Sequence, residues 1–147
     1  MSYTLSEVRP GDHRGMAQVR ALLEQEGISL DGNLDYTCGL FDEDDNLAAT
    51  GSSFGSTLRC FAVDRAHQGE GLLNQIVSHL VERLTGQGRT HLFVYTKVSA
   101  AKFFQDLGFY EIARVENTLS FLENRKNGFA RFCARLSQSR TEEPAAA

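Results

Sequence analysis

The chain has 147 residues, of which 41% are hydrophobic and 23% charged, and its formal net charge is −4. These values predict one soluble globular domain and give no electrostatic basis for binding nucleic acid. No apolar run is long enough to cross a membrane, and the N-terminus lacks the basic and apolar regions of a signal peptide. We therefore expect a cytoplasmic protein with neither nucleic acid nor a membrane as a partner.

Cysteine and histidine are too few and too scattered to suggest a metal site or a disulfide framework. The three cysteines, Cys38, Cys60 and Cys133, are an odd number and form no Cys-x-x-Cys pair. The four histidines do not recur at the spacing of metal ligands. We expect no structural disulfide and no bound metal.

The N-terminal part of the sequence predicts a strand followed by a helix. Residues 3–8 are expected to form an edge strand that ends at Pro10-Gly11. Asp12 is a candidate N-cap for a helix that runs to about Gln25 and stops at Gly27. The inward face of this helix would consist of Met16, Val19, Leu22 and Leu23.

Two further strands, residues 35–41 and 47–54, flank the acidic run Asp42-Glu-Asp-Asp-Asn46. The run begins like an EF-hand calcium loop, but the sixth and twelfth positions, which need glycine and glutamate, hold leucine and serine. A solvated hairpin turn is therefore the preferred interpretation. The glycine-rich end of the second strand, residues 51–55, is expected to be flexible.

The middle of the chain has the pattern of a strand, a glycine-containing turn and a helix. Residues 58–64 are compatible with a buried strand, and residues 65–71 carry Gly69 and Gly71. The next apolar residues recur at helical spacing: Leu72, Leu73, Ile76, Val77, Leu80, Val81 and Leu84. The turn would thus place glycines at the N-terminus of a helix, where backbone N–H groups and the helix dipole favour an anion such as phosphate.

Spacing alone does not identify the anion. A P-loop would need a lysine in this turn, and none is present. A dinucleotide fingerprint would need a third glycine at the position of Asn74. A glycine turn without any ligand is an open alternative at this point.

Residues 91–96 are dense in aromatic and β-branched residues and form the clearest strand in the sequence. Because a helix separates them from the strand at residues 58–64, the two strands are expected to be parallel neighbours. Ser99 is a candidate cap for a short helix over residues 100–107.

The C-terminal part predicts two more antiparallel strands, residues 109–115 and 118–122, and a last helix, residues 124–136. This helix is amphipathic and basic, and it is expected to dock its apolar face on the domain itself rather than on a membrane surface. Residues 137–147 are expected to be a disordered tail. The expected domain therefore covers residues 1–136.

Two segments of the sequence resemble a known superfamily. Val63-Asp-Arg-Ala-His-Gln-Gly-Glu-Gly-Leu-Leu73 and the later Phe104-Gln-Asp-Leu-Gly-Phe109 are similar to the acyl-CoA-binding core of the GNAT acetyltransferases. The resemblance implies an α+β fold in which a mixed, mostly antiparallel twisted sheet is flanked by helices. It also implies acetyl-CoA as the acyl donor and a reaction without a metal.

In this superfamily the backbone amides of a Gln/Arg-x-x-Gly-x-Gly/Ala turn hold the pyrophosphate of CoA. Gln68 and Gly71 match that pattern, and Leu73 replaces its last small residue. Carried over residue by residue, the resemblance implies that CoA is bound by Phe61, Ala62, Val63, Gln68, Gly69, Glu70, Gly71, Leu72, Leu73 and Phe104.

Within the superfamily, the run Thr90–Lys97, the strand 58–63 and the Gly-Glu-Gly-Leu turn resemble the N-terminal domain of citrate lyase ligase. Members of that family activate acetate with ATP and acetylate the thiol of a dephospho-CoA-like group on an acyl carrier protein. Their adenylating chemistry belongs to a second domain with an Asn-Pro-Phe-x-x-Gly-His signature, which this sequence does not contain. The chain is thus expected to be a stand-alone relative or one domain of a longer ligase.

Acetyl transfer to an amine requires a polarised thioester carbonyl, removal of a proton from the amine and donation of a proton to the leaving thiolate. The resemblance implies that the backbone around Phe61 to Val63 polarises the carbonyl. Many superfamily members donate the proton from a tyrosine, but the matching position here is Phe104. The candidate catalytic residues are Cys60, which could carry an acyl group, and Tyr95, which could replace the missing acid. Packing within the core is the simpler interpretation of both.

Three functions are open at this stage. The favoured one is an acetyl-CoA-dependent N-acetyltransferase with an unidentified amine or thiol acceptor, and an acyl carrier protein is one candidate acceptor. The second is a module that binds CoA or phosphopantetheine without chemistry, and the third is an interaction domain that serves a ligase or carrier-protein complex. Binding of CoA separates the first two from the third, and turnover with amines separates the first from the second.

Overall fold

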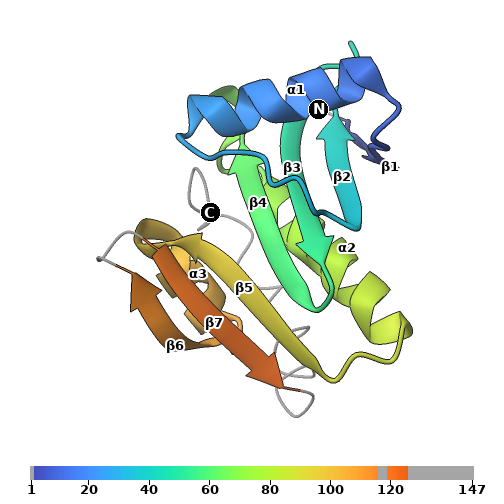
Figure 1. Cartoon of the computed structure of the whole chain (residues 1–147). Coiled ribbons are helices and arrows are strands. Elements are labelled where there is room, and N and C mark those ends of the chain that lie inside the picture. Colours follow the sequence, from blue (N-terminus) through green and yellow to red (C-terminus); the bar gives the residue numbers. More distant parts are fainter. Residues whose placement is uncertain (1, 116–118, 126–147) are drawn as a thin grey trace.

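The computed structural model describes residues 2–115 and 119–125. The described strands form one seven-stranded sheet in the spatial order β1-β2-β3-β4-β5-β7-β6, in which only β4 and β5 are parallel neighbours (Figure 1). The strands are β1 (Thr4–Glu7), β2 (Tyr36–Phe41), β3 (Leu47–Phe54), β4 (Thr57–Val63), β5 (His91–Lys97), β6 (Tyr110–Val115) and β7 (Leu119–Arg125). The helices are α1 (His13–Gln25), α2 (Leu72–Gly86), α3 (Val98–Asp106) and the short 3-10 helix η1 (Arg65–His67).

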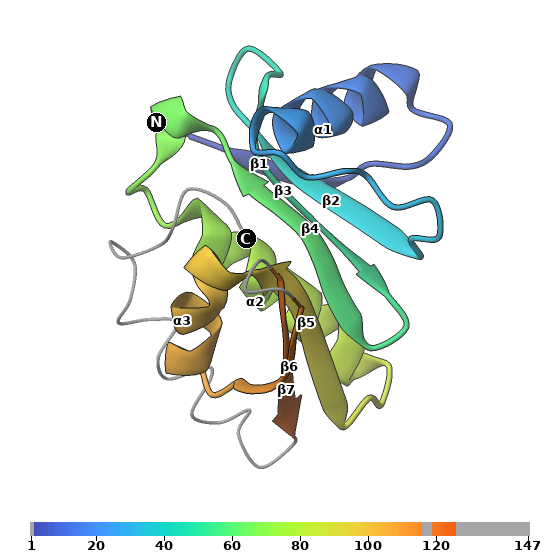
Figure 2. The ribbon, with the colours of Figure 1, turned by 60° about the vertical axis from the view of Figure 1, so that its left-hand side comes forward.

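The α-helices cover both faces of the sheet (Figure 2). On one face α1 packs through Val19, Leu22 and Leu23 against Cys60 and Ala62 of β4. On the other face α2 and α3 form a larger core with the sheet. The expected α+β fold, a mixed and mostly antiparallel sheet flanked by helices, is confirmed.

The signals that bound α1 act locally, and the structure confirms them. Asp12 is the N-cap, and its carboxylate accepts a hydrogen bond of 2.9 Å from the backbone N–H of Gly15. After the helix, Gly27 adopts a left-handed conformation with a φ of 73°. β1 lies at the edge of the sheet and pairs with β2, as residues 3–8 predicted.

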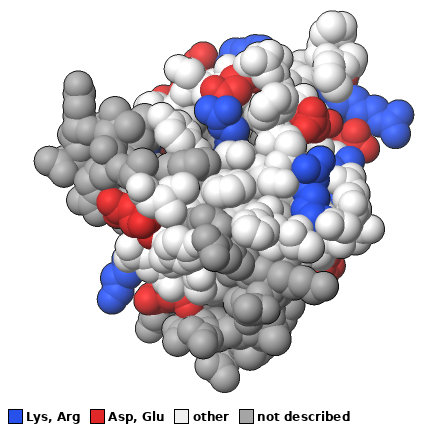
Figure 3. All heavy atoms as spheres, turned by 60° about the horizontal axis from the view of Figure 1, so that its bottom comes forward, with Lys and Arg blue, Asp and Glu red and all other residues white. Residues whose placement is uncertain are grey.

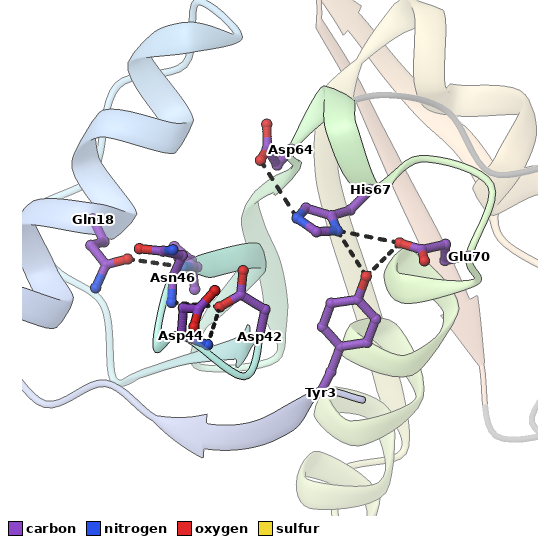
Figure 4. Close-up of polar contacts among 9 residues, drawn as sticks. Tyr3, Gln18, Asp42, Asp44, Asn46, Asp64, His67 and Glu70 are labelled. Carbon is purple, nitrogen blue, oxygen red and sulfur yellow. Dashed lines mark hydrogen bonds and ion pairs between the residues drawn. The ribbon is translucent and has the colours of Figure 1, made fainter. Parts of the chain in front are cut away.

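The acidic run between β2 and β3 is a hairpin turn, as expected. The carboxylate of Asp42 accepts hydrogen bonds of 2.9 Å from the backbone N–H groups of Asp44 and Asn46 (Figure 4). This carboxylate therefore closes the turn on its own backbone, which is a common role of aspartate at such positions.

The expectation of a flexible segment at residues 51–55 is wrong. β3 continues to Phe54, and residues 51–53 are buried within the sheet. A Cβ atom on Gly51 would lie 2.4 Å from Cγ2 of Ile76 and 2.9 Å from the ring of Phe61. Gly51 is thus needed for the close approach of α2 and Phe61 to the strand, and the glycine gives space rather than flexibility.

β4 and β5 are parallel, which confirms the predicted strand–helix–strand unit, but they pair only where they begin. Thr57 pairs with Phe93 and Leu58 with Val94, and no later pair joins the two strands. Figure 1 shows β4 and β5 diverging toward their C-terminal ends. Both the turn that precedes α2 and the residues that end β5 lie at this open end of the sheet.

Two C-terminal expectations are corrected. The helix α3 begins at Val98 with Lys97 as its N-cap, so Ser99 lies within the helix and does not cap it. β7 extends to Arg125, and Asn124 and Arg125 pair with β5, so the helix expected at residues 124–136 does not begin there. The rest of that helix and the expected tail lie outside the described residues. No helix in the described part of the chain is both long and apolar enough to span a membrane.

Candidate functional site

The glycine turn, Gln68–Gly71, connects η1 to α2 at the open end of the sheet. Gly69 and Gly71 both adopt left-handed conformations, with φ values of 82° and 76°. A Cβ atom on Gly69 would meet nothing within 4 Å, so the backbone conformation, not a lack of space, favours glycine there.

The N-terminus of α2 has no side-chain cap from its own N-cap residue. Gly71 is the N-cap and has no side chain to cap the helix, and the helix's backbone bonding begins from Gln75 N to Gly71 O at 3.2 Å. The side chains of Leu72 and Leu73 are fully buried in the core. The leucine at the position of the family's last small residue therefore packs into the protein. Unpaired N–H groups at the positive end of a helix dipole are suited to phosphate.

A cluster of polar side chains lies beside the glycine turn (Figure 4). Tyr3 Oη donates a hydrogen bond of 2.5 Å to Oε2 of Glu70 and lies 2.8 Å from Nδ1 of His67. On its other side, the His67 ring places Nε2 3.9 Å from Oδ2 of Asp64. The sequence indicated Tyr3 only as the start of an edge strand, because no local pattern relates residue 3 to residue 70.

This cluster shifts the pKa values of its members in opposite directions. Burial, followed by the hydrogen bond to the Glu70 carboxylate, raises the pKa of Tyr3 to about 12. The hydrogen bond from Tyr3 is in turn the main reason why the pKa of Glu70 is lowered. Near neutral pH, Tyr3 is therefore a neutral donor and Glu70 a carboxylate.

The second part of the site is a cavity of about 270 Å³ between the diverging strands. We call it the splay pocket. The loop after α1, the bulge of β4 and the end of β5 contribute its walls. It is lined by Gly27, Ile28, Ser29, Asp31, Arg59, Cys60, Tyr95, Thr96 and Lys97.

A β-bulge in β4 shapes this pocket. Cys60 has a φ of +57°, and the register with β3 shifts opposite Gly51. The bulge lets the consecutive residues Arg59 and Cys60 both line the pocket. Beyond the bulge the alternation resumes, so Phe61 and Val63 pack into the core of α2 and Ala62 into the core of α1.

Cys60 and Tyr95, the candidate catalytic residues, thus line the same pocket. The Cys60 thiol faces Asp31, with Sγ 3.5 Å from Oδ2, and burial raises its pKa to about 11. A raised pKa is the opposite of what an acyl-carrying thiolate needs. Tyr95 is only partly buried, and the guanidinium carbon of Arg59 lies 5.2 Å from the centre of its ring. It is therefore a pocket residue rather than a core tyrosine.

Charged residues from both β4 and β5 contact the loop after α1. Arg59 and Asp31 form an ion pair, with Nε 2.9 Å from Oδ2. The geometry of this contact is not that of a hydrogen bond from Nε. Lys97 donates a hydrogen bond to the backbone carbonyl of Glu26. These contacts tie the loop after α1 to both β4 and β5.

Phe104, which the resemblance assigned to CoA binding, is fully buried. Its ring centre lies 5.6 Å from that of Phe61, 5.2 Å from that of Phe103 and 5.8 Å from that of Phe109. The described residues that line the splay pocket do not include it. The position at which many GNAT enzymes have a tyrosine therefore offers packing here and no hydroxyl group.

The described residues contain no group of three or more histidine, cysteine, aspartate or glutamate side chains placed to hold a metal ion. On the face shown in Figure 3, the basic and acidic side chains of the described residues are interspersed rather than gathered into one patch.

Comparison with known proteins identifies the family. The sequence profile of the acetyltransferase (GNAT) domain matches residues 19–123. The chain is 30% identical over 118 residues to [citrate [pro-3S]-lyase] ligase of Klebsiella pneumoniae, which covers 80% of this chain and 34% of that protein. It is 25% identical over 131 residues to the ligase of the same name from Haemophilus influenzae, covering 89% and 39%. The chain thus spans less than two fifths of the length of these curated relatives.

Solved structures share the fold. A GNAT-family acetyltransferase from Staphylococcus aureus Mu50 matches with a TM-score of 0.70 and 12% identity, over 85% of this chain and 99% of that one. N-acetylglutamate synthase from Neisseria gonorrhoeae, solved with coenzyme A and N-acetyl-glutamate, matches with a TM-score of 0.64 and 18% identity, over 85% of this chain and 35% of that one. By the family profile and the shared fold together, the chain belongs to the acetyltransferase (GNAT) domain family.

Proposed function

We propose that the chain is an N-acyltransferase that uses acetyl-CoA and transfers the acetyl group to an amine. The observation that carries the proposal is the course of β4. Its bulge lines the splay pocket, and its end leads through the short helix η1 into the glycine turn. An acyl donor anchored by its phosphates at the turn could therefore present its thioester at the pocket.

In this proposal the pyrophosphate of CoA binds the backbone of Gln68, Gly69, Glu70 and Gly71 and the first N–H groups of α2, at Leu72 and Leu73. The pantetheine arm lies along the edge of β4 that faces β5. Only Thr57 and Leu58 of β4 pair with β5, so no strand in the described part of the chain pairs with this edge at Phe61 to Val63, where the arm would bind. A backbone N–H there would polarise the thioester carbonyl.

The acceptor amine would enter the splay pocket and attack the carbonyl carbon. A C–N bond forms, the C–S bond breaks, the amine loses a proton to water and the CoA sulfur gains one. Of the hydroxyl-bearing residues that line the pocket, Ser29, Tyr95 and Thr96, we assign Tyr95 as the proton donor to sulfur, because a phenol is the strongest acid among them. Cys60 stays a protonated thiol and carries no acyl group, because its pKa is raised.

A second candidate function is supported by Phe104. A fully buried phenylalanine at the usual tyrosine position suits a module that binds CoA or phosphopantetheine without chemistry. For this function the ligand to test is the dephospho-CoA-like group of an acyl carrier protein, which the resemblance to citrate lyase ligase implies. An interaction domain in a ligase or carrier-protein complex would need neither ligand.

Calorimetric titration with acetyl-CoA and with dephospho-CoA, followed by an amine screen, separates these functions. Micromolar binding of acetyl-CoA with turnover of at least one amine is the result we expect. Equal affinity for dephospho-CoA without turnover would favour the non-catalytic module. Absence of binding to both ligands would overturn the acyltransferase proposal and leave the interaction domain.

A further inference from the structure

Glu70 places a carboxylate in the glycine turn, where it could interfere with the binding of an anion. It is the residue between Gly69 and Gly71, so a negative charge lies next to the helix end that is proposed to hold pyrophosphate. A carboxylate near the first turn of a helix is itself stabilised by the dipole and can accept hydrogen bonds from the same N–H groups. A free Glu70 side chain would therefore compete with the ligand and repel it.

The structure shows what holds this carboxylate. Tyr3 Oη donates to Glu70 Oε2 at 2.5 Å, and His67 Nδ1 lies 3.4 Å from the same oxygen. Figure 4 shows the Glu70 side chain directed toward Tyr3 and His67. Tyr3 is the residue just before β1 and lies 67 positions earlier in the sequence than Glu70. The contact therefore depends on the pairing of β1 with β2 at the edge of the sheet.

We propose that Tyr3 is a positioning residue for the acyl-CoA site, which holds the Glu70 carboxylate away from the first turn of α2 and so leaves its N–H groups open to the pyrophosphate. The inference rests on the proposed binding of acetyl-CoA at the glycine turn. His67 assists by bonding to the Tyr3 hydroxyl at 2.8 Å, which orients that hydroxyl toward Glu70.

Among the groups around Glu70, Tyr3 has the largest effect on its carboxylate. Asp64, 3.9 Å from His67 Nε2, and Asp42, whose charge contributes to the raised pKa of Tyr3, are acidic and cannot draw that carboxylate aside. His67 and the charge of the N-terminal amino group also lower the pKa of Glu70, but the hydrogen bond from Tyr3 lowers it most. The neutral phenol of Tyr3 makes the shortest contact to it.

The test is a double-mutant cycle on the affinity for acetyl-CoA, measured by calorimetry on the full chain. Tyr3→Phe should weaken binding about three- to tenfold, because the released carboxylate competes for the helix end. Glu70→Gln alone should bind acetyl-CoA up to about threefold more tightly than the wild type, because it removes a negative charge beside the proposed pyrophosphate site. Tyr3→Phe combined with Glu70→Gln should bind as Glu70→Gln alone does, since no carboxylate remains to compete.

The matched control is Tyr36→Phe. This variant also removes a tyrosine–histidine hydrogen bond, the one of 2.6 Å between Tyr36 Oη and His79 Nε2 of α2. That hydrogen bond lies away from the glycine turn. The affinity of this variant for acetyl-CoA should equal that of the wild type. Circular dichroism and thermal unfolding verify that each variant is folded.

Glu70→Asp and Glu70→Gln leave Tyr3 unchanged, so comparing them tests the inference even if Tyr3→Phe does not fold. Glu70→Asp keeps the charge but shortens its reach to Tyr3, so it should weaken binding as Tyr3→Phe does. The inference is overturned if Glu70→Gln fails to restore the affinity lost in Tyr3→Phe, or if Glu70→Asp and Glu70→Gln bind alike. Wild-type protein that does not bind acetyl-CoA would overturn the proposed function together with this inference, whereas equal binding by all variants would overturn this inference alone.

Discussion

The thiol of Cys60 and the carboxylate of Asp31 face each other across the splay pocket, with Sγ 3.5 Å from Oδ2. A carboxylate at this distance accepts a hydrogen bond from the thiol and disfavours the thiolate. The bulge at Cys60 and the loop after α1 bring the two groups together, and their contact bears directly on how the pocket could work.

Replacing Cys60 with alanine should keep both the affinity for acetyl-CoA and the turnover of an accepted amine within about threefold of the wild type, because a thiol with a raised pKa is a poor nucleophile. Steady-state kinetics with the best amine of the screen measures this. Loss of turnover with unchanged affinity would contradict it and return Cys60 to the role of an acyl carrier.

The same thiol predicts how stability depends on alkaline pH. Its folded-state pKa is raised from 9.0 to about 11, so the stability it contributes is fully present below about pH 9 and is lost as the pH rises through about 11. The melting temperature should fall over this window, and it should fall less steeply in Cys60→Ala. Cys38→Ala should also make the fall less steep, and over a wider window that extends to about pH 12, because the pKa of Cys38 is raised from 9.0 to about 12.

Changing Gly71 to aspartate should weaken acetyl-CoA binding by about tenfold or more, since a negative charge would stand at the N-cap of α2. Gly71→Asn is the matched control. Asparagine has the same shape, is neutral and tolerates the left-handed conformation that Gly71 adopts at a φ of 76°. Equal affinities of the two variants, both folded, would contradict an anion site at the glycine turn.

Removing the hydroxyl of Tyr95 should lower kcat by about a hundredfold and leave the dissociation constant of acetyl-CoA unchanged, as expected for the loss of a general acid. Tyr95→Phe keeps the ring that packs beneath the Arg59 guanidinium, so the pocket should hold its shape. An unchanged kcat across the pH range would remove Tyr95 from the mechanism.

Adding a methyl group at Gly51 should destabilise the protein by about 1–3 kcal/mol, because it overpacks the core. The new Cβ would lie 2.4 Å from Ile76 and 2.9 Å from Phe61. Gly86→Ala is the control with the opposite sign: Gly86 ends α2 with nothing within 4 Å of its Cβ position, and alanine there should be neutral or stabilising. Denaturant unfolding of both variants compares them, and a Gly51→Ala variant as stable as the wild type would contradict the packing.

Features that depend on residues close in sequence were predictable. The cap at Asp12, the stop at Gly27, the apolar stripe of α2 and the turn at Gly69 and Gly71 each follow from a few neighbouring residues. The match of the turn to the family pattern could also be recognised from the sequence. Anion binding there depends on backbone N–H groups that glycine exposes, and the glycines recur at a characteristic spacing.

Features set by pairing between distant strands were not predictable. Asn124 and Arg125 have the polarity of a helix start, yet pairing with Leu92 and His91 makes them strand residues. Ser99 has the chemistry of a cap, but α3 begins before it. For Asn124 and Arg125, pairing with β5 outweighed a weak local preference.

By itself, then, the sequence determined the order of most strands and helices, the glycine turn and the family pattern, because periodicity and turn chemistry act over a few residues. Only the tertiary structure decided which side chains meet. The packing of Phe104 against Phe61 and the contact between Tyr3 and Glu70 arise where segments far apart in the sequence pack together, and the bulge at Cys60 arises in the pairing of β4 with β3. Such contacts depend on the register and divergence of strands across the whole sheet, which no local pattern encodes.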